Sequence, residues 1–189
     1  MPFTRMRLDK FLSWDPDYSS GAKWQLVDGE PVAMAPASTP HAEIQAELTT
    51  LLGNHVLGRK PCRVLIKPGV VPRVRADRNY RVPDMAVTCE PPNRDQMLQT
   101  PVVLVENLSS SNEIGTNSNI WAFTTIPSAM EILSIHSTRI AASLLRRYPD
   151  GNWPAEPVEI GSDGMLVLDS IGFEVPLLGC YRTAFLGRA

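Results

Sequence analysis

The pattern of apolar and polar positions along the chain predicts a mixture of helices and strands. A short helix is expected at about residues 7–13. The segment "WQLVDGEPVAMAP" then predicts a β-hairpin, because Asp28-Gly29 supplies the positive φ angles of a tight turn and β-prone residues flank it. No internal repeat or low-complexity tract interrupts this pattern. The N-terminal part of the chain is therefore expected to be folded.

The first long helix is expected in "STPHAEIQAELTTLLGN". Ser38 or Thr39 can cap it, Pro40 suits its first turn, and Gly53 can end it. Apolar residues recur at the spacing of one helical face, at Ile44, Leu48, Leu51 and Leu52. This stripe predicts an amphipathic helix with one apolar face.

Three strands are expected next, in "CRVLIKPGVVPRV", "RVPDMAVTC" and "VVLVENL". The last strand ends in Glu106, and a lone buried carboxylate is costly, so either Glu106 lies beyond the buried part or something compensates its charge. If the last two strands form an antiparallel hairpin that closes near Cys89 and Pro101, Asp84 lies opposite Glu106 on the same side of the sheet. Facing carboxylates are unfavourable unless a cation or a proton lies between them.

The rest of the chain continues the alternation of helix and strand. A helix is expected at about residues 117–125, followed by strands in "AMEILSIHS", "RIAASLLRRY" and "GMLVLDSIGFEV" and a last short helix in "PLLGCYRTAF". This order predicts an α/β or α+β sandwich around a mixed sheet.

Composition is that of an ordinary soluble protein, with 43% hydrophobic and 20% charged residues in 189 residues, a length that suits one domain. No stretch approaches the roughly 20 apolar residues of a membrane span, and the N-terminus lacks the apolar core of a signal peptide. We therefore expect a cytoplasmic protein without a membrane partner. The three cysteines lack metal-ligand spacing and are expected to be reduced and mostly buried.

The net charge of −2 does not require a nucleic-acid partner, but the charge is unevenly placed. A basic stripe with one intervening acid, Asp77, comprises Arg59, Lys60, Arg63, Lys67, Arg73, Arg75, Arg78 and Arg81. Such a stripe can attract a polyanion even on an acidic protein. It can equally be the solvated face of a hairpin.

The two acids Asp84 and Glu106 form a candidate divalent-metal site. Mg²⁺ prefers oxygen ligands and is commonly held by one or two carboxylates together with water and phosphate oxygens. Such an ion can polarise a phosphodiester and lower the pKa of an attacking water. Spacing alone is weak support, because many hairpins carry two acids by chance.

Several segments resemble, in order, the Uma family of restriction-endonuclease-like bacterial proteins, whose fold is that of the PD-(D/E)xK nucleases. They are "WQLVDGEPVAMAPAS" followed by a histidine, "RVPDMAVTC", "VLVENLSSSNE" and "IPSAMEILSI". The resemblance covers about residues 8–185. It implies a restriction-endonuclease-like fold, with a mixed central β-sheet flanked by helices. It also implies Mg²⁺ or Mn²⁺ as cofactor, DNA as partner and a homodimer.

The implied layout is one domain over residues 1–189. An N-terminal helix and hairpin would occupy about 1–36, a nuclease-like core about 37–148, and C-terminal strands and a helix about 149–189.

The resemblance also implies roles for individual residues. Asp84 and Glu106 would bind the metal, and His41 matches a family histidine near the site. Glu47 could be an accessory acid at its edge. Alternatively, His41 simply caps or packs its helix, and Glu47 lies on a solvated helix face.

The sequence departs from the family pattern where a catalytic lysine is expected. Leu108 stands two residues after Glu106, and Asn119 occupies the alternative position on the following helix, where Gly115 also replaces an acid. Asn119 can donate a hydrogen bond but carries no charge. Lys67 or an arginine of the basic stripe could substitute for the lysine, and contacts to the DNA backbone are expected from Arg73, Arg75 and Arg81.

Three functions follow from these residues. The first is a Mg²⁺-dependent endonuclease that hydrolyses phosphodiester bonds in DNA. The second is a catalytically impaired nuclease-fold protein that acts as a dimeric binding or scaffold module, which the missing lysine favours. The third is hydrolysis of a different phosphoester.

Overall fold

A six-stranded sheet forms the centre of the computed structural model, which describes residues 5–14, 22–109 and 113–187. The strand order is β3-β4-β5-β6-β7-β8, and only β5 and β6 are parallel. The strands are β3 (Arg63–Ile66), β4 (Met85–Thr88), β5 (Pro101–Leu108), β6 (Glu131–His136), β7 (Ala142–Arg146) and β8 (Val158–Ile160). The parallel pair needs a crossover connection, and α3 (Glu113–Phe123) lies within it.

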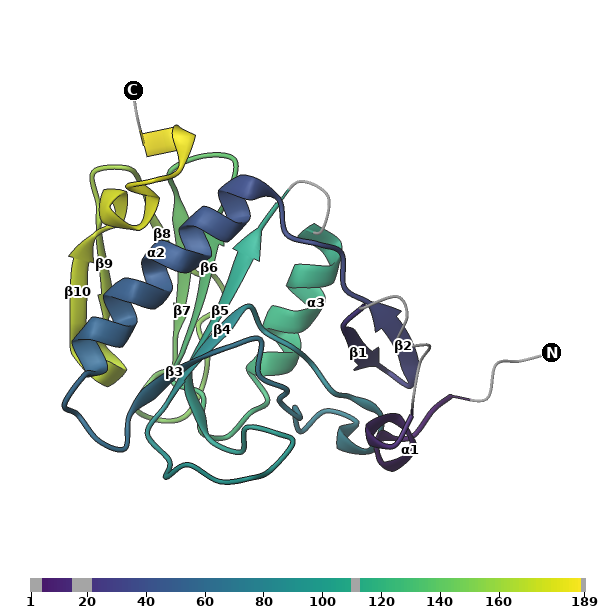
Figure 1. The fold of residues 1–189 in the computed structure, drawn as a ribbon. Coiled ribbons are helices and arrows are strands. Elements are labelled where there is room, and N and C mark those ends of the chain that lie inside the picture. The colour runs from purple at the N-terminus through teal and green to yellow at the C-terminus, as the bar shows by residue number, and fades with distance from the viewer. Residues whose placement is uncertain (1–4, 15–21, 110–112, 188–189) are drawn as a thin grey trace.

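The two longer helices cover opposite faces of this sheet (Figure 1). α2 (Thr39–Val56) buries its apolar stripe against side chains such as Met85 and Val105. Phe123, at the end of α3, packs with Ala86 and Leu104 in a second cluster. Because side chains alternate along a strand, neighbouring residues of β4 and β5 point to different helices. The side that faces α3 is the side that carries the candidate acids.

Smaller elements attach at both ends of the chain. At the N-terminus they are α1 (Leu8–Leu12), β1 (Trp24–Val27) and β2 (Glu30–Ala33), and the β1–β2 hairpin lies beyond α3 (Figure 1). Its backbone is bonded to the segment around the 3₁₀ helix η2 (Ala76–Arg78). At the C-terminus, β9 (Met165–Leu168) and β10 (Phe173–Pro176) form a second hairpin against α2, with the 3₁₀ helices η3 (Asp169–Ile171), η4 (Leu177–Tyr181) and η5 (Phe185–Gly187).

The predicted class, a mixed sheet flanked by helices, is confirmed, but several element boundaries differ. α2 continues past Gly53 to Val56, because burial of Val56 outweighs the roughly 1 kcal/mol helix penalty of a glycine. Gly58, with φ +88°, follows the helix end instead. Ser38 precedes α2 without a side-chain cap hydrogen bond, and the predicted last helix is a 3₁₀ helix.

The expectation of three reduced cysteines is wrong for two of them. Cys62 and Cys89 form a disulfide, whereas Cys180 is free and buried. The physical reason is the pairing of β3 with β4, in which Arg63 lies opposite Thr88. The next residues outward are the two cysteines, so they meet across the strand ends. Their separation of 27 residues along the chain gave no sign of this contact.

Within the described part of the chain, no helix is both long enough and apolar enough to cross a membrane.

Candidate active site

Asp84 and Glu106 converge on one cavity of about 390 Å³. Met85 of β4 pairs with Val105 of β5, so the two acids are the next residues outward in the register that the sequence predicted. Glu106 follows the alternation of Leu104 and faces α3, whose Asn119 contacts it. Their exposed fractions are only 5% for Asp84 and 6% for Glu106. The structure therefore brings the two carboxyl groups together in a nearly buried position.

Three contacts, one from Asn107 and two from Lys67, hold Asp84 in place. Its Oδ2 atom accepts a hydrogen bond of 2.8 Å from the backbone N–H of Asn107 on the neighbouring strand. Its Oδ1 atom lies 3.9 Å from the Nζ atom of Lys67, which follows β3 and also donates its backbone N–H to the Asp84 carbonyl. Among the described residues that line the cavity, Lys67 has the only lysine or arginine side chain. The cation predicted as a substitute thus lies beside the first acid.

Glu106 has a pKa well above its ordinary value of 4.5, first because it is buried and second because Asp84 is close. The Nδ2 atom of Asn119 donates a 2.9 Å hydrogen bond to its Oε1 atom, which lowers this pKa, as do the charges of Lys67 and Arg81. These contacts offset the burial only in part. The pair of acids accordingly favours a proton or a cation in the cavity.

Arg81 carries a positive charge and contacts Asn119 on the side away from Glu106. Its Nη1 atom donates a 2.9 Å hydrogen bond to the Oδ1 atom of Asn119, and its Nε atom donates one of 3.2 Å to Asn79. The Asn119 amide is thereby oriented with its oxygen toward Arg81 and its nitrogen toward Glu106. Arg81 is 3% exposed, and burial lowers its pKa from the ordinary value.

Arg81, predicted as a contact to the DNA backbone, is buried, and its guanidinium faces Asn119 and Asn79 rather than solvent. Its place in the site depends on a bridge between Val70 and Arg81, which positions the side chain beside α3. Residues distant along the chain make these contacts, so the sequence carried no signal for them.

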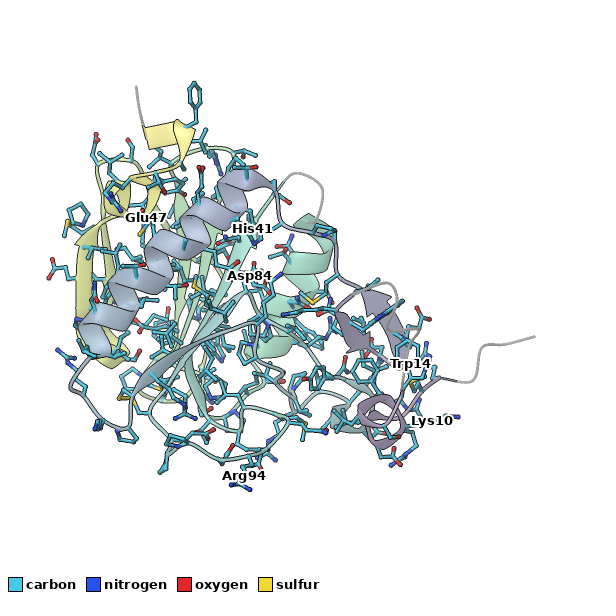
Figure 2. All side chains as sticks on the ribbon, viewed as in Figure 1. Lys10, Trp14, His41, Glu47, Asp84 and Arg94 are labelled. Carbon is cyan, nitrogen blue, oxygen red and sulfur yellow. A yellow bond between two sulfur atoms is a disulfide. The ribbon has the colours of Figure 1, made fainter. Side chains whose placement is uncertain are left out.

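His41 lies at the N-terminal end of α2, directly beside Asp84 (Figure 2). Its Nε2 atom is 3.2 Å from the Oδ1 atom of Asp84, yet it forms no hydrogen bond with any residue that the structure describes. The side chain is 7% exposed and lines the cavity. Because Asp84 Oδ1 lies near this nitrogen without forming a hydrogen bond of good geometry, His41 is placed to contact both Asp84 and a group bound in the cavity.

Other predicted site residues lie outside the cavity. Glu47 is farther along α2 (Figure 2) and forms a two-pronged ion pair with Arg182, at 2.8 and 3.2 Å. Arg73 and Arg75 are exposed, and Arg75 pairs with Asp28 at 2.8 Å. None of these residues lines the cavity. The basic stripe is therefore divided among separate contacts rather than gathered at the acids.

The end of the N-terminal hairpin and the segment that leads from it into α2 form a wall of the cavity that the sequence did not predict. Seven consecutive residues, from Val32 to Ser38, line it, together with Gln25 of β1. The Oε1 atom of Gln25 is buried and has no hydrogen-bond partner among the described residues. The predicted turn located the hairpin, but only the tertiary structure placed it opposite the acids.

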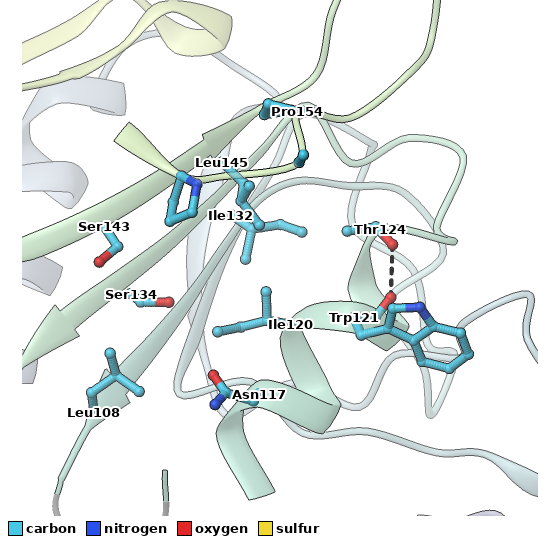
Figure 3. Close-up of a pocket in the computed structure, with 12 residues that line it drawn as sticks. Leu108, Asn117, Ile120, Trp121, Thr124, Ile132, Ser134, Ser143, Leu145 and Pro154 are labelled. Atoms are coloured by element: carbon cyan, nitrogen blue, oxygen red, sulfur yellow. Dashed lines mark hydrogen bonds between the residues drawn. The ribbon is translucent and has the colours of Figure 1, made fainter. Parts of the chain in front are cut away.

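A second cavity, of about 320 Å³, lies between α3 and the strands β6 and β7 (Figure 3). Its described lining includes Ile120, Trp121 and Leu145 but no Asp, Glu, Lys, Arg or His. It therefore lacks groups for acid–base or metal chemistry.

The donor set fits a magnesium-type ion. The carboxylates of Asp84 and Glu106 face one cavity, and a divalent cation would relieve the repulsion that contributes to the raised pKa of Glu106. Among the described residues, no group of three or more His, Cys, Asp and Glu side chains is arranged to hold a metal. An ion held here would complete its coordination with water or substrate oxygens.

Comparisons with known proteins show the fold and the family of the chain. The crystal structure of a "putative nuclease belonging to DUF820" from Anabaena variabilis shares the fold, with a TM-score of 0.77 over 94% of this chain and 98% of that one, at 15% identity. An "uncharacterized protein" of Synechocystis sp. is 29% identical over 186 residues, which is 96% of this chain and 94% of the relative. The model of the Uma2 family, described as "Putative restriction endonuclease", matches residues 8–177. The chain therefore belongs to the Uma2 family.

Proposed function

We propose that the protein is a divalent-metal-dependent nuclease that hydrolyses phosphodiester bonds in DNA. The observation that carries the proposal is the convergence of Asp84 and Glu106 on one cavity, with Lys67 beside them. The family description as restriction endonucleases supports a nuclease activity. DNA as substrate and Mg²⁺ or Mn²⁺ as cofactor are parts of the proposal.

Asp84 and Glu106 would hold the ion through their carboxylate oxygens. When bound, Mg²⁺ or Mn²⁺ polarises the phosphodiester and lowers the pKa of an attacking water. The hydrogen bond from Asn107 N–H fixes one oxygen of Asp84 and leaves the other directed at the cavity, near Lys67. Asn119 fixes Glu106 in the same way, and Arg81 fixes Asn119. The two ligands would thus be oriented before the ion arrives.

Lys67 would bind the charged phosphate oxygens, as the side chain of opposite charge on the cavity wall. Lys67 would thus take the role of the lysine that the family pattern has at one of two positions, which Leu108 and Asn119 occupy in this chain. His41, which lines the cavity with its Nε2 atom 3.2 Å from Asp84 Oδ1, would hold a substrate oxygen or an attacking water.

A second function is favoured by the uncharged side chains at Leu108 and Asn119. If Lys67 does not replace the lysine, the protein would bind metal and nucleic acid without turnover and act as a binding module. The two proposals predict the same metal site and differ only in cleavage.

Calorimetric titration with Mn²⁺, combined with cleavage of labelled DNA, tests both proposals. We expect wild type to bind Mn²⁺ and Asp84→Asn and Glu106→Gln to bind it at least about tenfold more weakly, because each loses an anionic ligand. Lys67→Met is expected to retain Mn²⁺ but to lose about 10²–10³ in cleavage rate.

Asp163→Asn is the matched control, because it removes an exposed carboxylate outside the cavity. Absence of Mn²⁺ binding by wild type at millimolar concentration would contradict the metal site itself. Metal binding without detectable cleavage would favour the binding module.

A further inference from the structure

The cavity at the acids is small for a nucleic-acid duplex. Its volume of about 390 Å³ lies near the lower end of the range of about 300–1,000 Å³ for small-ligand pockets. Asp84 and Glu106 are 5% and 6% exposed within it. A group that reaches both carboxylates must therefore enter the cavity, and the space suits a single nucleotide rather than stacked base pairs.

The two sides of the cavity differ in chemistry. Asp84, Glu106 and Lys67 form one side, where a phosphodiester and its metal would lie. The other side is the wall of Val32–Ser38, and the sequence contains no Lys, Arg, Asp or Glu from Pro31 to Ala42. Apolar and neutral groups pack well against a base and a sugar but offer no charge to a second phosphate backbone.

The distribution of cations also disfavours a duplex. Proteins that bind duplex DNA neutralise several of its phosphates with lysine and arginine side chains. Lys67 is the only such side chain on the described cavity lining, and Arg75 is engaged with Asp28. A base in a duplex would have to unpair and leave its stack to enter this cavity, which costs free energy that an unpaired base does not require.

The β1–β2 hairpin, whose Val32 and Ala33 begin the apolar wall, is fixed to the fold. Leu26 and Tyr80 exchange two backbone hydrogen bonds, of 2.8 and 2.9 Å, and Gly29 N–H donates one of 2.8 Å to Arg78. The backbone N–H of Asp28 donates to the Oδ1 atom of buried Asn79 at 3.0 Å. Admitting a duplex by moving the hairpin would break these bonds together.

We propose that this cavity accepts one unpaired nucleotide, with its base against Val32–Pro36 and its phosphate between Lys67 and the two acids. The substrate class is then single-stranded or locally unpaired DNA. This inference rests on the proposed function for the site, but it predicts binding as well as cleavage.

The test compares DNA binding by wild type in Ca²⁺, measured by fluorescence anisotropy. The probes are a labelled single strand, the same strand annealed to its complement, and a duplex with an unpaired internal segment. We expect the single strand and the unpaired segment to bind at least about tenfold more tightly than the full duplex. Equal or tighter binding of the full duplex would overturn the inference, and so would absence of binding to any probe.

Two methionine variants test the wall itself. Met34→Ala removes an apolar side chain that lines the cavity, whereas Met165→Ala removes one that is 44% exposed on β9 and does not line it. We expect Met34→Ala to weaken single-strand binding on the order of fivefold and Met165→Ala to leave it unchanged. Equal effects of the two variants would show that the wall does not contribute to single-strand binding.

These measurements separate the inference from the proposed function. A preference for the single strand in Ca²⁺, without cleavage in Mn²⁺, would retain the substrate class and reject the nuclease. Cleavage of the duplex as fast as the single strand would retain the nuclease and reject the substrate class.

Discussion

Glu106 is a buried carboxylate at the end of an apolar strand, with a second carboxylate beside it. Hydrogen-bond donors and positive charges around it explain how the strand accommodates this acid. The side chain lies within the buried layer, and Asn119, Lys67 and Arg81 offset part of its cost. Of the two sequence-based alternatives, exposure beyond the buried part or compensation of the charge, the structure shows the second. In the structure the compensation is shared among residues from three separate segments, and repulsion from Asp84 remains.

The raised pKa of Glu106 predicts a pH-dependent stability in the metal-free protein. In the unfolded chain this carboxyl titrates near its ordinary value of 4.5, whereas the folded protein holds its proton to higher pH. The stability associated with this residue is therefore complete below about pH 4.5 and is lost as the pH rises toward the folded pKa. Glu106→Gln keeps the shape but cannot ionise.

We expect Glu106→Gln and wild type to unfold at similar temperatures near pH 4.5 in EDTA, and the variant to be more stable at pH 8. The difference grows by at most about 1.4 kcal/mol per pH unit until Glu106 ionises in the folded protein. Thermal unfolding across this pH range measures it. Parallel pH profiles of the two proteins would show that the carboxyl is not perturbed. Added Mn²⁺ should stabilise wild type and not the variant.

Among the elements, β6 carries a buried acid whose role differs from that of Glu106. Glu131 is 1% exposed, and its Oε1 atom accepts hydrogen bonds from Arg146 at 2.8 Å and from Asp169 N–H at 2.9 Å. Its Oε2 atom accepts from both the N–H and the hydroxyl of Ser170. Glu131 thus joins β6 and β7 to η3, the turn between β9 and β10. Its oxygens are satisfied within the protein, so they are not directed at a ligand.

Glu131→Ala should reduce the free energy of unfolding by about 3 kcal/mol, because it leaves buried donors and Arg146 without their partner. Urea unfolding measures the loss. Glu174→Ala on β10 is the control, since Glu174 is exposed and its replacement is expected to change stability by less than about 0.5 kcal/mol. A loss equal to that of the control would mean that Glu131 does not anchor the C-terminal hairpin.

Element types were predictable from sequence to the extent that they depended on local patterns. The Asp28-Gly29 turn, the apolar stripe of α2 and the apolar run of β5 correspond to the observed elements. The boundaries of the elements were less predictable. Burial of Val56 extends α2 to that residue. β3 ends at Ile66, because the chain turns at Lys67, whose φ angle is +49°. That turn directs Lys67 to Asp84.

At the scale of the whole molecule, the Cys62–Cys89 disulfide links β3 to β4 across a closed loop of 27 residues. It joins two strands that together bring Lys67 and Asp84 to the cavity. A cross-link of this loop length stabilises a protein by about 3–4 kcal/mol in the chain-entropy description.

Thiol counting and unfolding together test the disulfide. Unreduced, unfolded protein should contain one free thiol, Cys180, and reduced protein should contain three. Cys62→Ser combined with Cys89→Ser should lower the free energy of unfolding on the order of 3 kcal/mol relative to unreduced wild type. With reductant present, wild type and the double variant should become similar. Three free thiols in the unreduced protein would contradict the disulfide.

The class of fold, the main helices and strands, the placement of Asp84 opposite Glu106 and the family resemblance could all be predicted from the amino-acid sequence. These features follow from local periodicity and from short motifs, which act over a few residues. The burial of Arg81 behind Asn119, the ion pair of Glu47 with Arg182 and the position of residues 32–38 on the cavity wall became apparent from the three-dimensional fold. Each of these depends on packing between segments far apart in the chain, and a one-dimensional pattern of polar and apolar residues does not encode such contacts.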